Sequence, residues 1–254
     1  MRGAVAVLNI VLGEVYTSYG ILTIIDLKRG WRQRGFSHFG LAWIAMAFTC
    51  GPHHLEHGLH VAFAGRAGGP LDLLAVVVGL PAGVAWFLLR VEALLGGRGD
   101  RFLPGTPRGV AALPALSGAY LAVYVAWVGL ILRHGGDFGP KLVPNVLLLG
   151  LYGVIGFYLL RTQLANRLSL GGWSLSGLSL AIVFPTCGLM HAVSAVYASS
   201  GRYDVDVHGL VIDWLAVPAA VYFLWVVRAL HHNAFADWNR GATGVRREPV
   251  EAIA

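Results

Sequence analysis

One segment decides the fold of this chain: residues 48–60, which read FTCGPHHLEHGLH. The segment places four histidines, a cysteine and a glutamate inside an otherwise apolar run. In such a run each ionisable side chain loses hydration free energy on the order of several kcal/mol, so it normally faces the interior of a helix bundle. We therefore expect a membrane helix whose polar side points into a bundle and marks a functional site.

Helical geometry gathers most of these polar groups on one side of the predicted helix. At about 100° per residue, a stripe roughly 80° wide contains Cys50, His53, His57 and His60. His54 lies at the margin of this stripe. The polar side extends over about three turns, or roughly 15 Å of helical rise.

A second copy of the pattern occurs downstream, at residues 184–191, which read FPTCGLMH. The cysteines are separated by 187 − 50 = 137 positions, and the histidines by 191 − 54 = 137. The same offset matches seven further identical pairs between residues 35–84 and 172–221. This self-similarity predicts an internal duplication, without a gap, of residues 8–94 as residues 145–231.

The composition identifies the class of protein. Of 254 residues, 56% are hydrophobic and only 13% are charged, and the mean hydropathy is +0.65. These values predict a polytopic membrane protein, which we expect in the plasma (cytoplasmic) membrane. The two cysteines exclude a disulfide scaffold. The net charge of +6 comes from residues scattered between apolar segments, so the lipid bilayer, and not nucleic acid, is the expected partner.

Seven apolar segments are each about long enough to cross 30 Å of hydrocarbon. They cover about residues 4–25, 38–64, 71–95, 110–132, 143–164, 173–198 and 208–230. A basic connector is expected at residues 28–34, a polar, glycine-rich loop before Arg108, and a polar tail after residue 232. The fold class is therefore an all-α integral membrane protein with seven transmembrane helices.

The distribution of basic residues predicts the orientation. An N-terminus outside and a C-terminus in the cytoplasm place 14 of the 19 Lys and Arg residues on the cytoplasmic side. Because four crossings separate segments one and five, the repeats are parallel, in a 3+1+3 arrangement. The predicted units are residues 1–96, the loop and linking helix 97–142, residues 143–232, and the tail 233–254.

This plan is similar in helix number to the SWEET sugar transporters and to the seven-helix rhodopsins. The residues typical of those families are missing. The only lysines, Lys28 and Lys141, lie in connectors, so the seventh segment has no lysine for a retinal Schiff base. The Pro-Gln pair typical of SWEET-like proteins is absent, because Pro81 and Pro218 are each followed by alanine. We assign no family on these residues.

The two Cys-x-x-x-His pairs predict a cofactor between the repeats. Their spacing places a thiol and an imidazole on one face of each helix. If the two helices meet, Cys50, His54, Cys187 and His191 offer a ligand set for zinc or copper. Alternatively, His54 and His191 ligate one haem b that exchanges electrons with quinone. The simpler interpretation is a packing face of small residues with hydrogen-bonded histidines.

Further candidate ligands lie in the outer half of the predicted bundle. His53, His57 and His60 have the spacing that lets one helix offer several ligands. The group is completed, near the same side, by His208, Asp213, Asp72, Asp204 and Asp206. This set suffices for one or two transition-metal ions (copper, iron or zinc). The two loop aspartates are equally expected simply to face water, and Asp72 to cap its helix.

Three carboxylates are candidate catalytic groups. Glu56 or Asp213 would orient imidazoles or move protons. Glu14, near the middle of segment one, is a candidate ligand or proton carrier, or a hydrogen-bonded structural residue.

The inner half of the bundle offers few polar side chains, which favours a site over a transport path. The sequence thus predicts a metal-dependent membrane enzyme, an oxidoreductase or hydrolase, or a redox protein, acting on a lipid or small apolar substrate. Two alternatives remain open: a haem b electron carrier linked to quinone, and a metal-cation transporter or metal-handling protein.

Overall fold

The computed structural model describes residues 1–63, 68–105, 108–134, 142–199 and 207–233. Within these residues the chain forms seven long helices, one single-turn helix and two short strands. In chain order these are α1 (Arg2–Arg34), α2 (His38–Phe63), α3 (Pro70–Leu94), β1 (Phe102–Leu103), α4 (Arg108–Ala111), α5 (Leu113–His134), α6 (Leu142–Asn166), β2 (Trp173–Ser174), α7 (Leu175–Ser199) and α8 (Val207–His231). The predicted all-helical architecture is confirmed.

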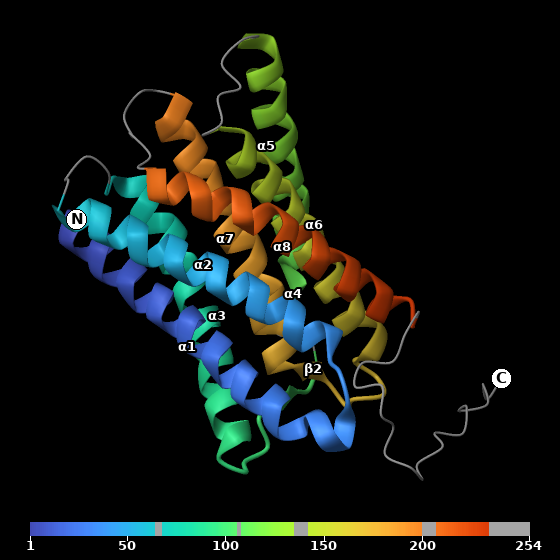
Figure 1. Ribbon diagram of the computed structural model, residues 1–254. Coiled ribbons are helices and arrows are strands. Elements are labelled where there is room, and N and C mark those ends of the chain that lie inside the picture. Colours follow the sequence, from blue (N-terminus) through green and yellow to red (C-terminus); the bar gives the residue numbers. More distant parts are fainter. Residues whose placement is uncertain (64–67, 106–107, 135–141, 200–206, 234–254) are drawn as a thin grey trace.

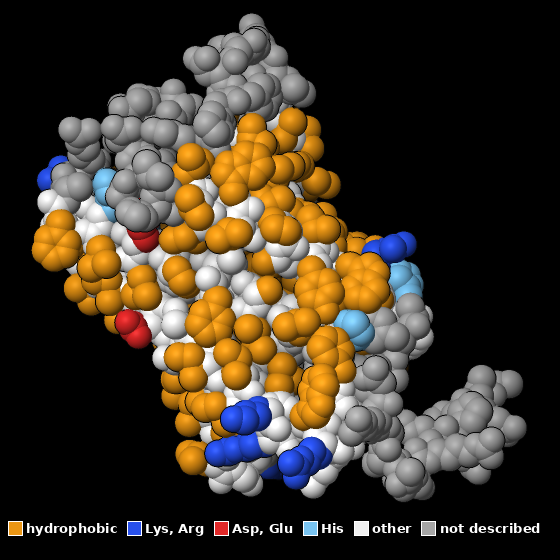
Figure 2. All heavy atoms as spheres, viewed as in Figure 1, with side chains coloured by type: hydrophobic (Ala, Val, Ile, Leu, Met, Phe, Trp, Pro, Cys, Tyr) orange, Lys and Arg blue, Asp and Glu red, His pale blue; other side chains and the backbone are white. Residues whose placement is uncertain are grey.

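Five of these helices, α1, α3, α6, α7 and α8, are long and apolar enough to cross a membrane. The histidines and Glu56 of α2 reduce its hydropathy, and the apolar stretch of α5 that the structure describes is shorter, Leu113–Gly129. Figure 2 shows hydrophobic side chains spread over the face in view, with Lys and Arg side chains gathered at the lower end, where α1 ends. The protein is a membrane protein by these criteria.

Helix α1 is longer than its hydropathy predicts. The prediction of a connector at residues 28–34 is wrong, because α1 continues through these residues to Arg34. Positive charge is favourable at a helix C-terminus, and Asp26 binds Arg34 at 3.3 Å and Arg90 of α3 at 2.8 Å. The helix ends where Gly35 adopts a positive φ of 78° and donates its N–H to the Trp31 carbonyl.

Six helices form a closed ring in the order α1, α2, α8, α6, α7 and α3, with α3 returning to α1. Helix α5 lies outside this ring against α6, at the edge of the bundle in Figure 1. Glycines bring the α1 and α2 backbones together: a side chain at Gly13, Gly51 or Gly58 would collide with the facing helix. Such close approach is the usual mode of helix packing in membranes. The ring encloses the buried polar residues described below.

The short strands β1 and β2 occupy a region where the sequence predicts only a loop and the start of a helix. They pair antiparallel, with Phe102 opposite Ser174 and Leu103 opposite Trp173. Asp100 holds this connection: its carboxylate accepts hydrogen bonds from the Ser174 hydroxyl at 2.6 Å and the Ser176 N–H at 2.9 Å. Partial burial raises the pKa of Asp100, but these hydrogen bonds outweigh burial and hold its pKa below the ordinary value.

Replacing Asp100 tests this connection. We expect Asp100→Asn to lower the midpoint of thermal unfolding in detergent at pH 7 by roughly 2–6 °C, because hydrogen bonds to a charged acceptor are lost. A carboxyl with a depressed folded-state pKa stabilises above its unfolded pKa of about 3.9, and this contribution disappears as the pH falls through the folded value. The difference between the two proteins should therefore shrink in acid.

Glu92→Gln is the matched control. Glu92 is partly exposed and pairs with Arg101 at 2.9 Å, and such surface pairs contribute little. An equal effect of the two substitutions would contradict the assigned role of Asp100.

Candidate metal centre

A buried His/Asp group lies where four helices of the ring meet. His53 (α2), His191 (α7) and Asp213 (α8) each offer one ligand atom, and these atoms all lie within 4.8 Å of one another. The Asp213 carboxylate oxygen Oδ1 is 2.9 Å from Nδ1 of His53 and 3.8 Å from Nδ1 of His191. The three residues are 7%, 3% and 2% exposed, respectively. Among the described residues, these three form the group with spacing suited to a metal ion.

Asn145 of α6 orients two members of this group. Its side-chain oxygen lies 2.7 Å from Nδ1 of His191, and its amide nitrogen donates to Oδ2 of Asp213 at 2.9 Å. Asn145 is fully buried. It therefore directs Nδ1–H of His191 towards itself, because an amide oxygen can only accept. This leaves Nε2 as the unprotonated nitrogen of His191.

Several atoms of the group lack the hydrogen bonds that burial demands. Both ring nitrogens of His53 and Oδ1 of Asp213 are shielded from solvent and have no hydrogen-bond partner among the described residues. The 2.9 Å approach between His53 and Asp213 is close enough for ionic attraction but is not aligned as a hydrogen bond. Each unsatisfied buried polar group costs about 1–3 kcal/mol. Such atoms, facing one another, fit the donor set of a metal ion.

A similar arrangement surrounds His54. We call His54 and His191, the histidines of the two Cys-x-x-x-His pairs, the central histidines. Its Nδ1 lies 2.9 Å from the Asn9 side-chain oxygen on α1, and its Nε2 lies 3.9 Å from Sγ of Cys187. The ring of Tyr16 packs edge-on against His54, as the ring of Tyr152 does against His191. Each central histidine thus has one asparagine and one tyrosine as neighbours.

The two cysteines lie between these histidines and contact tyrosines of the opposite unit. Sγ of Cys187 is 3.5 Å from the Tyr16 hydroxyl, and Sγ of Cys50 is 3.1 Å from the Tyr152 hydroxyl. Both cysteines are free and buried. Hydrogen bonding therefore links the α1–α2 unit to the α6–α7 unit through sulfur.

A second His/carboxylate contact lies on the α3 side of α2. Nε2 of His57 is 3.3 Å from Oδ1 of Asp72, and both side chains are buried. The other oxygen of Asp72 accepts the backbone N–H groups of Gly68 and Gly69 at 3.0 and 2.8 Å. Asp72 therefore caps the start of α3, not as the expected N-cap residue, which is Gly69, but from the third position of the helix. The same carboxylate also positions His57.

The remaining predicted residues lie outside this buried group. His60 and Glu56 are partly exposed on α2, and Glu14 is exposed on the surface of α1. His208 belongs to the first turn of α8, but its side chain, like Asp204 and Asp206, lies outside the described residues.

Sequence reasoning missed Asn9, Asn145, Tyr16 and Tyr152. A signal for these residues exists in the sequence, with an offset one shorter than for the cysteines: 145 − 9 = 136 and 152 − 16 = 136. The alignment of the first helices therefore needs a one-residue shift, which an ungapped comparison cannot find.

Comparisons with family models, curated proteins and solved structures found no match to this chain.

The asparagines provide a stability test of the site. We expect Asn145→Ala to destabilise the protein more than Asn9→Ala, because Asn145 satisfies both His191 and Asp213 whereas Asn9 satisfies His54 and its own helix. Each buried group left unpaired costs about 1–3 kcal/mol. Thermal unfolding of both variants in the same detergent measures the difference. A larger effect of Asn9→Ala would contradict the asymmetry described here.

Proposed function

We propose that this protein is a membrane metalloprotein in which His53, His191 and Asp213 hold one transition-metal ion. The observation that carries the proposal is the approach of three buried ligand atoms to within 4.8 Å, at a place where His53 and Asp213 have atoms without hydrogen-bond partners in the described part of the chain. Buried ionisable groups in membrane proteins are normally paired or coordinate a metal. A metal ion would satisfy one ring nitrogen of His53 and the Asp213 oxygen at once.

The donor set narrows the choice among copper, iron and zinc. Two imidazoles and one carboxylate are typical ligands of non-haem iron(II) sites and of catalytic zinc sites, which keep coordination positions open. We therefore favour iron or zinc. When bound, such an ion would supply Lewis acidity towards a substrate oxygen or water. Asn145 would hold His191 and Asp213 in place, a role in which supporting groups affect affinity by about 10–100-fold.

The contacts of His54 favour this centre over a bis-histidine haem. Asn9 and Cys187 lie 2.9 and 3.9 Å from the two ring nitrogens of His54. Ligation of a haem by His54 would have to displace Cys187. It would also give no functional role to the pair formed by His53 and Asp213.

An aromatic cluster inside the ring favours a metal-binding site over a transport path for cations. Towards the basic end of the ring, the interior holds Trp43, Trp86, Phe184 and Phe223, all 5% exposed or less. Their rings pack with centroid separations of 4.1 Å for Trp43 with Trp86 and 4.8 Å for Phe184 with Phe223. A hydrated cation finds few ligands there, so transport is the less favoured function.

We further propose that the two three-helix units, residues 1–96 and 143–232, arose by internal duplication. Exchanging α1, α2 and α3 for α6, α7 and α8 leaves the order of helices in the ring unchanged. Local hydrogen bonds also recur at the offset of 137: Ser37 and Ser174 each accept the N–H three residues later, both at 2.9 Å. Seven crossings, an outward N-terminus and a plasma-membrane location complete this proposal.

The proposed repeat explains why one ion is expected and not two. At the offset of 137, the counterpart of His53 is Met190, and the counterpart of Asp213 is Val76. Both counterparts are buried. Thus His191 faces His53 and Asp213, whereas the corresponding positions near His54 hold apolar side chains. One half of the proposed pseudosymmetric interior therefore lacks this ligand pair.

An enzymatic activity, oxidation or hydrolysis of a lipid or small apolar substrate, is the function that this centre suits best. Its chemistry would take place in the half of the bundle away from the basic end. The buried His57–Asp72 pair lies in that same half and can move a proton. Glu56, partly exposed on the same helix, is a further candidate.

Metal analysis of the detergent-purified protein tests the centre. We expect about one iron or zinc ion per chain, and at least a tenfold loss of affinity in His53→Ala and Asp213→Asn, because each removes a ligand. Elemental analysis and calorimetric titration with Zn²⁺ measure both quantities.

His38→Ala is the control, because His38 contacts the Tyr222 hydroxyl at 3.0 Å, at the start of α2 and away from the centre. The proposal fails if the wild type binds no metal, or if both ligand variants retain it. A Soret band that disappears in His54→Ala or His191→Ala would establish haem in its place.

A further inference from the structure

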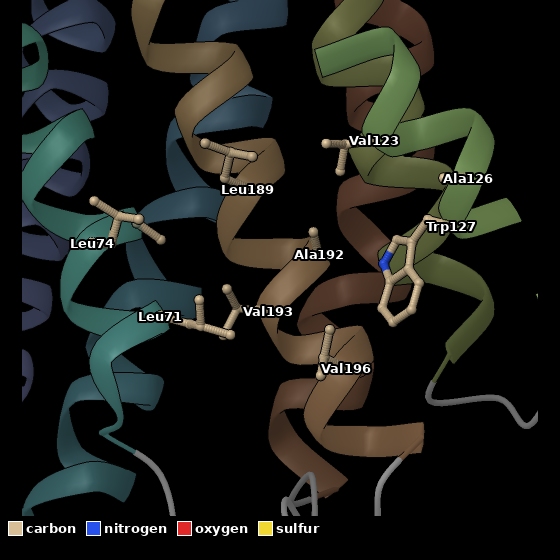
Figure 3. Close-up of a pocket in the computed structure, with 10 residues that line it drawn as sticks. Leu71, Leu74, Val123, Ala126, Trp127, Leu189, Ala192, Val193 and Val196 are labelled. Carbon is tan, nitrogen blue, oxygen red and sulfur yellow. The ribbon is translucent and has the colours of Figure 1, made fainter. Parts of the chain in front are cut away.

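The surface of the bundle has hollows of different chemistry. The groove between α3, α5 and α7 is lined by apolar and aromatic side chains only (Figure 3). It therefore does not distinguish one apolar occupant from another. A second hollow, of about 490 Å³, lies on α1 near its C-terminal end and is lined by Leu27, Lys28, Trp31 and Arg32. This hollow combines apolar and cationic groups, so it can select its occupant by charge.

The second hollow lies where α1 leaves the hydrocarbon region of the membrane. Helix α1 has 33 residues and is therefore about 50 Å long, whereas the hydrocarbon core is about 30 Å thick. The apolar sequence of α1 ends at Leu27, and the turns that follow contain Lys28, Arg29, Arg32 and Arg34. These last turns belong to the basic end of the bundle (Figure 2). They therefore reach the level of the lipid headgroups.

One exposed stripe of α1 changes from apolar to basic along its length. Ile21, Ile25, Lys28 and Arg32 are all exposed, and their spacing of four, three and four residues places them on one face of the helix. The stripe covers about 16 Å of helical rise. Trp31 is 49% exposed beside its basic part, and tryptophan is typical of the membrane interface. A phospholipid has the same order of chemistry, a hydrocarbon chain followed by a phosphate.

The basic part of the stripe has an excess of positive charge. Asp26, the acidic residue nearest to it in the sequence, is bound by Arg34 at 3.3 Å and by Arg90 at 2.8 Å. In the described part of the chain, no acidic side chain forms an ion pair with Lys28. The chemistry that complements this surface is therefore an anionic group attached to a hydrocarbon chain.

We propose that Lys28, Trp31 and Arg32 bind the headgroup of one anionic phospholipid, and that an acyl chain of this lipid lies along Ile21 and Ile25. A zwitterionic lipid fits less well, because its own cationic group repels the basic side chains. None of these residues is a proposed metal ligand, so this proposal and the metal centre can fail independently.

A comparison of two lipids with identical acyl chains tests the role of charge. Palmitoyl-oleoyl phosphatidylglycerol and palmitoyl-oleoyl phosphatidylcholine are titrated separately into the delipidated full-length protein in detergent, and native mass spectrometry measures the bound lipid. We expect the wild type to bind phosphatidylglycerol about tenfold more tightly, because each basic residue near a membrane surface contributes about fivefold. Lys28→Gln/Arg32→Gln should bind the two lipids within about twofold of each other, with unchanged metal content.

Arg161→Gln/Arg167→Gln is the matched control. Both arginines are exposed near the end of α6, which lies towards the same side of the bundle as the end of α1 (Figure 1). This double substitution removes the same charge, so it should leave the lipid preference of the wild type unchanged. Circular dichroism confirms that each variant is folded.

Three outcomes would overturn the proposal. The first is equal binding of the two lipids by the wild type, and the second is an equal loss of preference in the control variant, which would indicate a general effect of charge. The third is displacement of phosphatidylglycerol by an equal concentration of inorganic phosphate, because a free anion lacks the chain that is proposed to pack on Ile21 and Ile25.

Discussion

The arrangement of this bundle depends on a single buried carboxylate. Asp213 is 2% exposed inside helices whose outer surfaces are apolar, and an unpaired charge there would cost several kcal/mol, roughly, after relaxation. Its partners come from three other helices: His53 on α2, Asn145 on α6 and His191 on α7. The polar contacts of Asp213 therefore require α8 to pack against α2 and α6. Asn145 of α6 also binds His191 of α7, so the same contacts position α7.

The interior combines polar contacts that recur around His54 and His191 with a His/Asp group in one half. Each central histidine has an asparagine partner, and each cysteine contacts a tyrosine of the opposite unit. These neutral hydrogen bonds hold the helices together without a buried charge. The ionisable pair of this group lies at two positions, His53 and Asp213, whose counterparts at the offset of 137 are apolar. The proposed chemistry thus needs only two polar residues beyond the shared framework.

The bilayer explains the remaining features. The ring contains an aromatic cluster towards its basic end and ionisable residues towards the other end, so polar groups are concentrated where a site is proposed. Outside the ring, α5 is held mainly by α6. In water such a helix would be poorly supported, but in a membrane lipid takes the place of protein neighbours.

Apolar length and helical period are local properties, and they were sufficient to predict α2, α3, α5, α6, α7 and α8 within three residues at each end, together with the polar side of α2. The end of α1 at Arg34 was missed because it depends on an ion pair with α3 and on the backbone conformation of Gly35. Asn9 and Asn145 were missed because their offset of 136 differs from that of the cysteines. The pairing of β1 with β2 was missed because it is supported by a contact between distant residues, Asp100 and Ser174. His53 and Asp213 are 213 − 53 = 160 positions apart in the sequence. Their contact was decided by tertiary packing alone, because the choice of neighbouring helices depends on how all of the helix surfaces fit together.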